Sequence, residues 1–417
     1  MKNINKYLTH YAEPCIKALD HFPTDIMFTH SVVIPAYKES VHFVERYINS
    51  VLAEQPSLMV LVINQPDYDA NVQPQQSLFN NVCALGELRW AHGAYTLITI
   101  NNSQASVLII DSYSYALPER QGVGLARKQG VDSALALIAN KNIQSEWICS
   151  TDADATLPDS YFEALSTLNS DDIGACFNFY HQCEDVEVHQ ANALYEQALR
   201  YYVDGLSYAG SHYNYFTIGS ILSFTAKAYA NVRGFPKRSA GEDFYLLNKL
   251  AKLGDVAYLK DHTVKLTARR SDRVPFGTGP AVNRIIELQH QQKAYCYYHP
   301  QVFVLLKEVL TAFTSVFDYL NNIEPWLAKL SPHAKSSLLS LGFNDFIAKQ
   351  HSQQSAQQKK LVEVKQANTQ FNKQLIVWFD AFKTLKFIHF AKANYWPDIP
   401  LAQAIAQAPF IMSNTNH

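Results

Sequence analysis

Two aspartates lie one residue apart in the stretch "ICSTDADATLPDSYF", residues 148–162, directly after a short apolar run. Carboxylates with this spacing at the end of a strand, here Asp152 and Asp154, can both present oxygens to one hard cation. Such a cation keeps open coordination positions for phosphate oxygens and neutralises the charge on a departing diphosphate. The pair therefore predicts a Mg²⁺ or Mn²⁺ site that handles a phosphate-bearing substrate.

The same string also fits a second chemistry, in which Asp152 is the nucleophile of an Asp-x-Asp-x-Thr phosphatase motif that ends at Thr156. That mechanism needs a second acid as proton donor and a later acidic pair to hold magnesium. The nearest candidate for the later pair begins at Asp255, and the next acid, Asp261, falls beyond the spacing that such a motif uses. The sequence favours the cation site, with a HAD-like phosphatase or a nucleotidyltransferase as alternatives.

A second acidic pair, Glu242 and Asp243 in "SAGEDFYLL", stands at the entrance to an apolar run of helical period. A carboxylate aimed at an acceptor hydroxyl can serve as a general base. Acids in the first turn of a helix are also favoured for purely electrostatic reasons. The pair is thus a candidate for the base only in combination with the aspartates after residue 151.

The elements that must position these acids are strands alternating with helices. Apolar strands are expected at residues 31–34, ending at Pro35, and at residues 58–63, stopped by Asn64; "AYTLITI", "SVLIIDS" and "SEWICS" give further strands. Nearly uniform apolar strands between helices predict an α/β fold with a mostly parallel sheet flanked by helices. Ligands in such folds bind beyond the carboxyl ends of the strands, where Asp152 also falls.

The pattern of apolar residues along the chain predicts three parts. Residues 1–29 form an N-terminal helical extension, residues 30–280 the α/β domain, and residues 281–417 a helical C-terminal region without strand punctuation. The Gln-rich stretch "AKQHSQQSAQQKKLVEVKQANTQ" within the last part is typical of a solvated helix or linker.

The composition is that of a globular protein without a strong overall field. The 37 acids nearly cancel the 35 Lys and Arg, so nucleic acid is not expected as a partner. The six cysteines form no CxxC pair, and no zinc-type spacing is present. The N-terminus lacks the apolar core of a signal peptide, and no apolar run approaches the roughly 20 residues that span a bilayer. A cytoplasmic location is expected, with peripheral attachment to the inner face of the membrane left open.

Four motifs in order resemble the family 2 inverting glycosyltransferases with the GT-A fold. They are "VVIPAYKE", "GVGLARKQGVDSALA", "STDADATLPDSYF" and "GEDFYLLNKL", the last preceded by "GSILSFTAKAYANVRGFP". Together they cover roughly residues 30–280. The resemblance implies a metal-dependent inverting transferase of the hexosyltransferase type, which moves a sugar from a nucleotide-sugar donor to an acceptor hydroxyl.

The resemblance also implies roles for the acids. Asp243 would deprotonate the acceptor, and Glu242 beside it would contact acceptor or sugar. Asp152 would contact the nucleotide sugar and the metal, Asp154 would bind the metal, and His262 would complete the metal shell.

Further positions match the donor side of the family pattern. Pro35, Tyr37 and Glu39 would border base and ribose, and Arg127 would face the nucleotide. Many relatives carry an acidic pair after the second strand that recognises uracil, whereas this chain has an amide, Asn64. An amide can both donate and accept hydrogen bonds, so base binding survives but a uridine donor does not follow.

A positive cluster follows in "TARRSDRVPFGTGPA", which contains Arg269, Arg270 and Arg273 before a glycine-flanked loop. Guanidinium groups suit phosphate oxygens, so the cluster predicts a clamp for a diphosphate or a phosphorylated acceptor. The acceptor itself, whether glycan, lipid or small metabolite, is not readable from the sequence. A non-catalytic module that binds sugar nucleotides is a further alternative.

Overall fold

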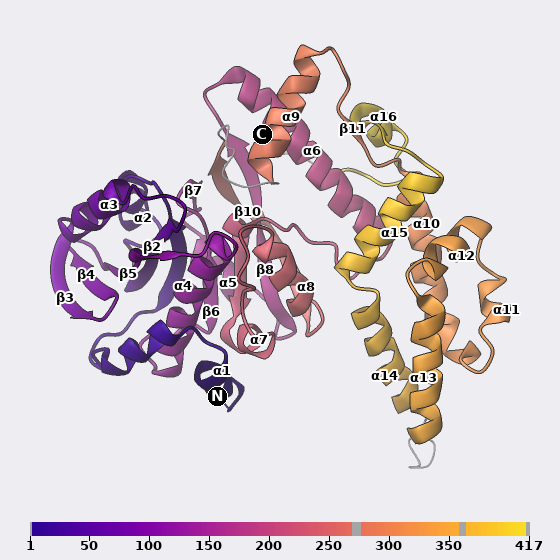
Figure 1. Cartoon of the computed structure of the whole chain (residues 1–417), viewed down its shortest axis with the longest axis horizontal. Helices are drawn as coiled ribbons and strands as arrows, with labels where there is room; N and C mark the ends of the chain where they lie inside the picture. The colour runs from indigo at the N-terminus through magenta and orange to yellow at the C-terminus, as the bar shows by residue number, and fades with distance from the viewer. Residues whose placement is uncertain (1, 269–276, 358–363, 414–417) are drawn as a thin grey trace. The chain divides into compact units, whose positions relative to one another are not determined.

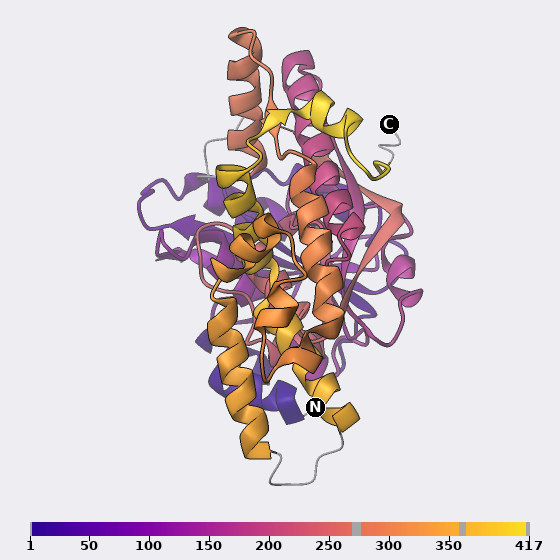
Figure 2. The ribbon, with the colours of Figure 1, turned by 90° about the vertical axis from the view of Figure 1, so that its right-hand side faces the viewer.

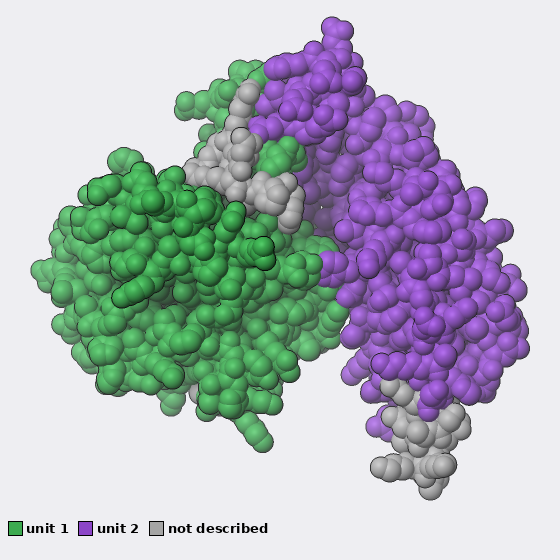
Figure 3. Space-filling model, viewed as in Figure 1, with its two compact units in different colours: residues 1–189, 217–281 green, residues 190–216, 282–417 purple. Residues whose placement is uncertain are grey.

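The structure is a computed structural model that describes residues 2–268, 277–357 and 364–413 (Figure 1). It has two compact units (Figure 3): unit 1 comprises Met1–His189 and Thr217–Ala281, and unit 2 comprises Gln190–Phe216 and Val282–His417. The chain therefore leaves unit 1, contributes one segment to unit 2, and returns before entering unit 2 a second time. The sequence pattern did not single out this early segment.

Unit 1 contains the sheet. Its strands are β1 (His30–Ala36), β2 (Ser57–Pro66), β3 (Gly86–His92), β4 (Tyr95–Ile100), β5 (Ala105–Leu117), β6 (Trp147–Ser150), β7 (Ala155–Thr156), β8 (Asp172–Gln182), β9 (Leu222–Thr225) and β10 (Asp255–Thr267). Its helices are α1 (Lys2–His10), η1 (Pro14–His21), α2 (His42–Ile48), α3 (Gln73–Cys83), α4 (Gly122–Ala139), α5 (Tyr161–Ser166), the start of α6 (Val186–Tyr208), η2 (Gly219–Ile221), α7 (Ala226–Asn231) and α8 (Glu242–Leu250).

The ten strands form one sheet in the order β3-β4-β5-β2-β1-β6-β9-β8-β10-β7. Strands β3, β5, β2, β1, β6, β8 and β10 run in one direction, and β4, β9 and β7 run in the other. The predicted α/β fold with a mostly parallel sheet flanked by helices is confirmed. Because β5, β2, β1 and β6 are parallel neighbours, their carboxyl ends meet at the same edge of the sheet.

Strand β1 does not end at Pro35, as the sequence predicted, but continues to Ala36 with Pro35 paired to Val62 of β2. On its other side β1 pairs with β6 only at Val32 and Val33, and the Val33 carbonyl accepts from the backbone N–H of Thr151. Backbone groups alternate between the two sides of a strand, so the nitrogen of Pro35 points to the same side as the Val33 carbonyl. At that position it lies beyond the end of β6. No ladder hydrogen bond is needed there, so proline is tolerated.

Helix α4 carries glycine where it crosses the sheet. A Cβ at Gly130 would lie 2.4 Å from Cγ1 of Val33 and 2.9 Å from Cγ2 of Val62. The helix axis can approach β1 and β2 this closely only because position 130 has no side chain. Residues on the first turns of α4 are thereby held above the carboxyl edge.

The other side of α4 binds the N-terminal extension through a buried carboxylate. Asp132 is fully buried and accepts from the Tyr7 hydroxyl at 2.6 Å, the Lys128 ammonium at 2.9 Å, the Tyr229 hydroxyl at 3.0 Å and the backbone N–H of Glu13 at 2.8 Å. Burial raises the pKa of Asp132, and Lys128 acts in the opposite direction. The four donors supply the partners that a buried carboxylate requires and connect residues 7–13 and α7 to α4.

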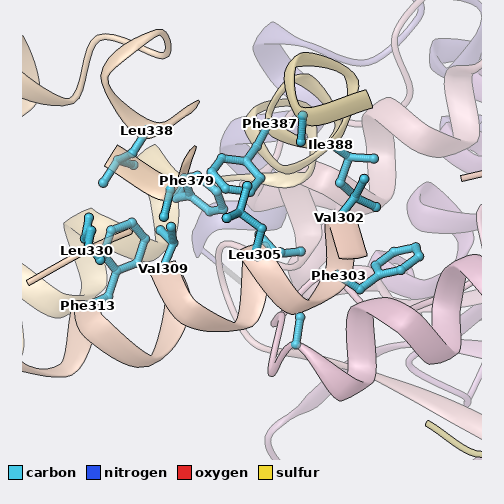
Figure 4. Packing of buried hydrophobic residues seen from close by; sticks show 14 of the residues in the cluster. Val302, Phe303, Leu305, Val309, Phe313, Leu330, Leu338, Phe379, Phe387 and Ile388 are labelled. Atoms are coloured by element: carbon cyan, nitrogen blue, oxygen red, sulfur yellow. The ribbon is translucent and has the colours of Figure 1, made fainter. Parts of the chain in front are cut away.

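Unit 2 consists of most of α6 and most of α9 (Thr278–His290), with β11 (Cys296–Tyr297), α10 (Gln301–Ala312), η3 (Phe313–Tyr319), α11 (Glu324–Leu327), α12 (Pro332–Leu339), α13 (Phe343–Gln357), α14 (Val364–Trp378), α15 (Ala381–Asn394), β12 (Ile399–Pro400) and α16 (Leu401–Ala406) (Figure 2). Its core is one apolar cluster around α10 (Figure 4), to which this helix contributes Val302, Phe303, Leu305, Leu306 and Val309. In the ranges that the structure describes, no helix is long and apolar enough to cross a bilayer.

The approach of α4 to the sheet gives a first prediction. Gly130→Ala should lower the free energy of unfolding by about 1–3 kcal/mol, because the added methyl overpacks the contact with Val33 and outweighs the better helix propensity of alanine. Urea unfolding followed by circular dichroism measures it. The control is Gly174→Ala in β8, where a Cβ would lie an ordinary 3.4 Å from Val256. A loss at position 174 as large as that at position 130 would contradict the packing argument.

Candidate functional site

Arg127 lies on the first turns of α4 and connects the end of β6 to the start of α8. Its Nε donates to Oε1 of Glu242 at 2.9 Å, and its Nη2 donates to Oδ1 of Asp152 at 2.6 Å. Its Nη1 donates to Oγ of Ser150 at 3.0 Å and to the carbonyl of Thr151 at 3.3 Å. Both acidic pairs singled out in the sequence are therefore represented around one guanidinium at the carboxyl edge of the sheet.

Burial sets the electrostatics of this group. Arg127 is 3% exposed and Glu242 is 5% exposed, whereas the side chain of Asp152 is 33% exposed. Burial by itself would lower the pKa of Arg127, but the carboxylates of Asp152 and Glu242 outweigh it and raise the pKa above its ordinary value. Burial, and then the charge of Glu242, raises the pKa of half-buried Asp243 to about 7.

The backbone of residues 152–155 is held by α2. The Arg46 guanidinium donates to the carbonyls of Ala153 and Ala155 at 2.7 and 2.8 Å, and the Tyr47 hydroxyl donates to the carbonyl of Asp152 at 3.0 Å. Sequence reasoning missed Arg46 and Tyr47, because within an amphipathic helix nothing marks them as partners of a loop about 100 residues away. These contacts fix the loop that carries Asp152 and Asp154.

A second polar cluster lies where β1 and β2 end. Oδ2 of Asp69 accepts from the Tyr37 hydroxyl at 2.5 Å and forms an ion pair with Lys38 at 2.7 Å. Hydrogen bonds from Lys38 and Tyr37 lower the pKa of Asp69 to about 2. Lys38 has a φ of 55°, in the left-handed region that non-glycine residues rarely adopt. Sequence reasoning identified Tyr37 but not Asp69 or Lys38.

The remaining donor-side candidates lie on the same edge. Pro35 is buried in β1, and its partner Val62 precedes Asn64 by two residues on the neighbouring strand. Asn64 is 9% exposed, and Glu39 is half-buried. Tyr37, Pro35 and Asn64 therefore lie at the ends of the paired strands β1 and β2. Arg127 contacts the end of β6, the strand on the other side of β1.

His262 is not brought to the acids. Its Nδ1 hydrogen-bonds Oγ of Ser160 at 2.8 Å, whereas the carbonyl of Asp154 accepts from the backbone N–H of Thr267. Residues 263–267 are regularly paired, so His262 lies at least about 13 Å along β10 from Thr267 at 3.3 Å per strand residue. The three arginines proposed as a phosphate clamp, Arg269, Arg270 and Arg273, lie outside the described residues.

The side chains of the described residues limit how the predicted Mg²⁺ or Mn²⁺ could be held. Among residues 2–268, 277–357 and 364–413 no three His, Cys, Asp or Glu side chains are grouped as an ion would need. Asp152 already neutralises Arg127. Mg²⁺ is often held by one or two carboxylates together with substrate phosphates and water. Asp154 and the free oxygen of Asp152 suit that second arrangement, in which the substrate supplies the other ligands.

Comparisons with known proteins leave the family open. No protein-family model matches this sequence, and no curated protein does. Among solved structures, TarS 1–349 of S. aureus in complex with UDP-GlcNAc is 10% identical with a TM-score of 0.40, covering 75% of this chain and 86% of that one. The same fragment in complex with UDP is 11% identical with a TM-score of 0.36, covering 88% and 91%. A mycobacterial protein is 11% identical with a TM-score of 0.32, covering 66% and 80%. Likeness at this level assigns neither family nor activity.

The site also depends on a glycine. A Cβ at Gly219 would lie 2.5 Å from Nη2 of Arg127, the atom that donates to Asp152. Gly219→Ala should therefore lower the free energy of unfolding by about 1–3 kcal/mol, because the guanidinium is pinned by its hydrogen bonds and cannot give way. Urea unfolding measures the loss. In an Arg127→Met background the same substitution should cost less; an undiminished cost would show that position 219 acts by another route.

Proposed function

We propose that the protein is a metal-dependent glycosyltransferase of the family 2 type, which moves a sugar from a nucleotide-sugar donor to an acceptor hydroxyl with inversion. The observation that carries this proposal is the junction of the two acidic pairs. Asp152 and Glu242, from segments far apart in the chain, bind the same guanidinium. A single displacement needs the leaving diphosphate and the base close together. Arg127 supports this arrangement because it binds both the donor-side carboxylate and the first residue of the helix that carries the base.

Asp243 is the residue proposed as the base. Glu242 is buried and bound to Arg127, whereas Asp243 next to it is half-buried. A pKa of about 7 leaves a useful fraction of Asp243 ionised at neutral pH and makes the carboxylate basic enough to accept a proton from a hydroxyl. Glu242 is better suited to holding the start of α8 than to contacting the acceptor.

Asp154 and Asp152 are proposed to hold Mg²⁺ or Mn²⁺ together with the donor. The ion, when bound, supplies positive charge for the departing diphosphate. The chain itself supplies a loop held by Arg46 and Tyr47, so the two carboxylates do not need to be ordered when the donor arrives.

The phosphatase alternative is less well supported by this geometry. It requires Asp152 as the nucleophile, but one oxygen of Asp152 is bound by Arg127 at 2.6 Å. A charge-assisted hydrogen bond of this length stabilises the carboxylate and reduces its tendency to attack phosphorus. The proposed transferase uses Asp152 as a fixed charge, which the ion pair does not oppose.

Donor binding gives the next prediction. One of UDP, GDP, dTDP, CDP and ADP should raise the melting temperature when Mn²⁺ is present and not without it. A ligand that binds only the folded state adds about 2.7 kcal/mol to the free energy of unfolding when its concentration is 100 times its Kd. Asp154→Asn should remove the shift, and Asp261→Asn, at an exposed acid of β10, should keep it. If none of the five stabilises the natural protein, the proposed function is wrong.

The base gives a further prediction. With nucleotide sugars that carry the nucleobase identified by that panel, Asp243→Asn should slow release of the nucleoside diphosphate by about 10²–10⁴-fold, the usual contribution of a general base. Nucleoside diphosphate binding should be retained. Because the raised pKa keeps Asp243 protonated in acid, the rate of the natural protein should rise with pH and reach half its plateau near pH 7. A flat pH profile, or an Asp243→Asn variant of full activity, contradicts the assignment.

A further inference from the structure

The hydrogen-bonding capacity of Arg127 is almost fully used within the protein. A guanidinium has five N–H donors, and four hydrogen bonds are formed, to Glu242, Ser150, Thr151 and Asp152. The side chain is 3% exposed. Little of it is left to present to a bound nucleotide, which is the role expected from the sequence.

The same four bonds connect three separate elements. Arg127 belongs to α4, Asp152 follows β6, and Glu242 is the first residue of α8. Asp243 comes next on α8, so the position of the proposed base depends on where Glu242 is held. Two glycines allow the arrangement: Gly219 leaves room for Nη2, and Gly241 has a φ of 72° at the start of α8.

We propose that Arg127 is a positioning residue that holds Asp152 and the start of α8 at a fixed separation, rather than a ligand of the donor. This inference rests on the proposed function, because the two groups that it separates are the donor-side carboxylate and the helix of the base. A guanidinium suits the task because its planar set of donors binds two carboxylates in different directions, which a lysine ammonium on a flexible stem does not reproduce.

The experiment uses the natural full chain, Arg127→Lys, Glu242→Gln, the double variant, and Arg89→Lys as a surface control whose side chain is 57% exposed. Two quantities are measured with the nucleoside diphosphate found by the panel and with nucleotide sugars that carry the same nucleobase. They are the Kd of the nucleoside diphosphate and the turnover of the nucleotide sugar. A structural role alone would not separate these two readouts.

The expected result is a split between binding and turnover. The Kd should stay within about threefold of the natural value in both single variants, while turnover falls by about 100-fold or more in each. Turnover of the double variant should be no lower than that of the worse single variant, because both substitutions break the same bridge. A tenfold weaker Kd in Arg127→Lys but not in Glu242→Gln would show that Arg127 acts on donor binding and not on the separation of the two acids, and would overturn the proposal. So would a double variant whose loss of turnover is the product of the two single losses.

A second measurement keeps this test separate from the proposed function. If no nucleoside diphosphate binds the natural protein, the proposed function has failed, and urea unfolding of the natural chain, the two single variants and the double variant still tests the bridge. If the two substitutions acted independently, the double variant would change the equilibrium constant of unfolding by the product of the two single changes. Its change should be at least about tenfold smaller than that product, because Arg127→Lys alone leaves buried Glu242 poorly paired. Coupling below about twofold would overturn the bridge. If Arg127→Lys does not fold, Glu242→Gln alone decides, by its Kd and turnover.

Discussion

The structure of the site depends on one buried guanidinium between two carboxylates. Taking Arg127 and Glu242 out of water carries a desolvation cost, which their ion pair and the additional hydrogen bonds to Ser150 and Thr151 must offset. Removing Arg127 would leave the buried Glu242 as an uncompensated charge. The arrangement of β6, α4 and α8 at the carboxyl edge is therefore specified by polar contacts as well as by the apolar core beneath them.

Helix α4 can hold that guanidinium in place because it is fixed on several sides. Gly130 brings it against β1 and β2, and Gly124 allows its backbone to approach residues 236–238, where the Gly124 N–H donates to the carbonyl of Arg238 at 2.9 Å. On its other side Asp132 binds the N-terminal extension and α7. A functional side chain is held most accurately on a rigid element whose supporting contacts are all satisfied, and α4 meets that condition.

Two adjacent acids have different environments because of how α8 begins. Glu242 points to Arg127 and is buried, whereas Asp243 is half-buried and has no hydrogen bond from an arginine among the residues that the structure describes. The burial of Asp243 and the charge of Glu242 raise its pKa, and the attraction of Arg127 only partly opposes them. One arginine thus gives neighbouring carboxylates different environments, with Glu242 as an anchor and Asp243 as the proposed proton acceptor.

The sequence by itself determined the α/β class, the strands predicted at residues 58–63 and in "SEWICS" (residues 145–150), the helix from Gly122 and the two acidic pairs, because period and residue type are local properties of the chain. It placed the end of β1 wrongly, since a proline is tolerated or not according to where β6 stops. It could not show Arg46, Tyr47 or Asp69 at the site, or that His262 hydrogen-bonds Ser160 and is not brought to the acids. Only the tertiary structure decided these points and the buried position of Arg127, because burial, partners and pKa depend on which distant segments the sheet brings together.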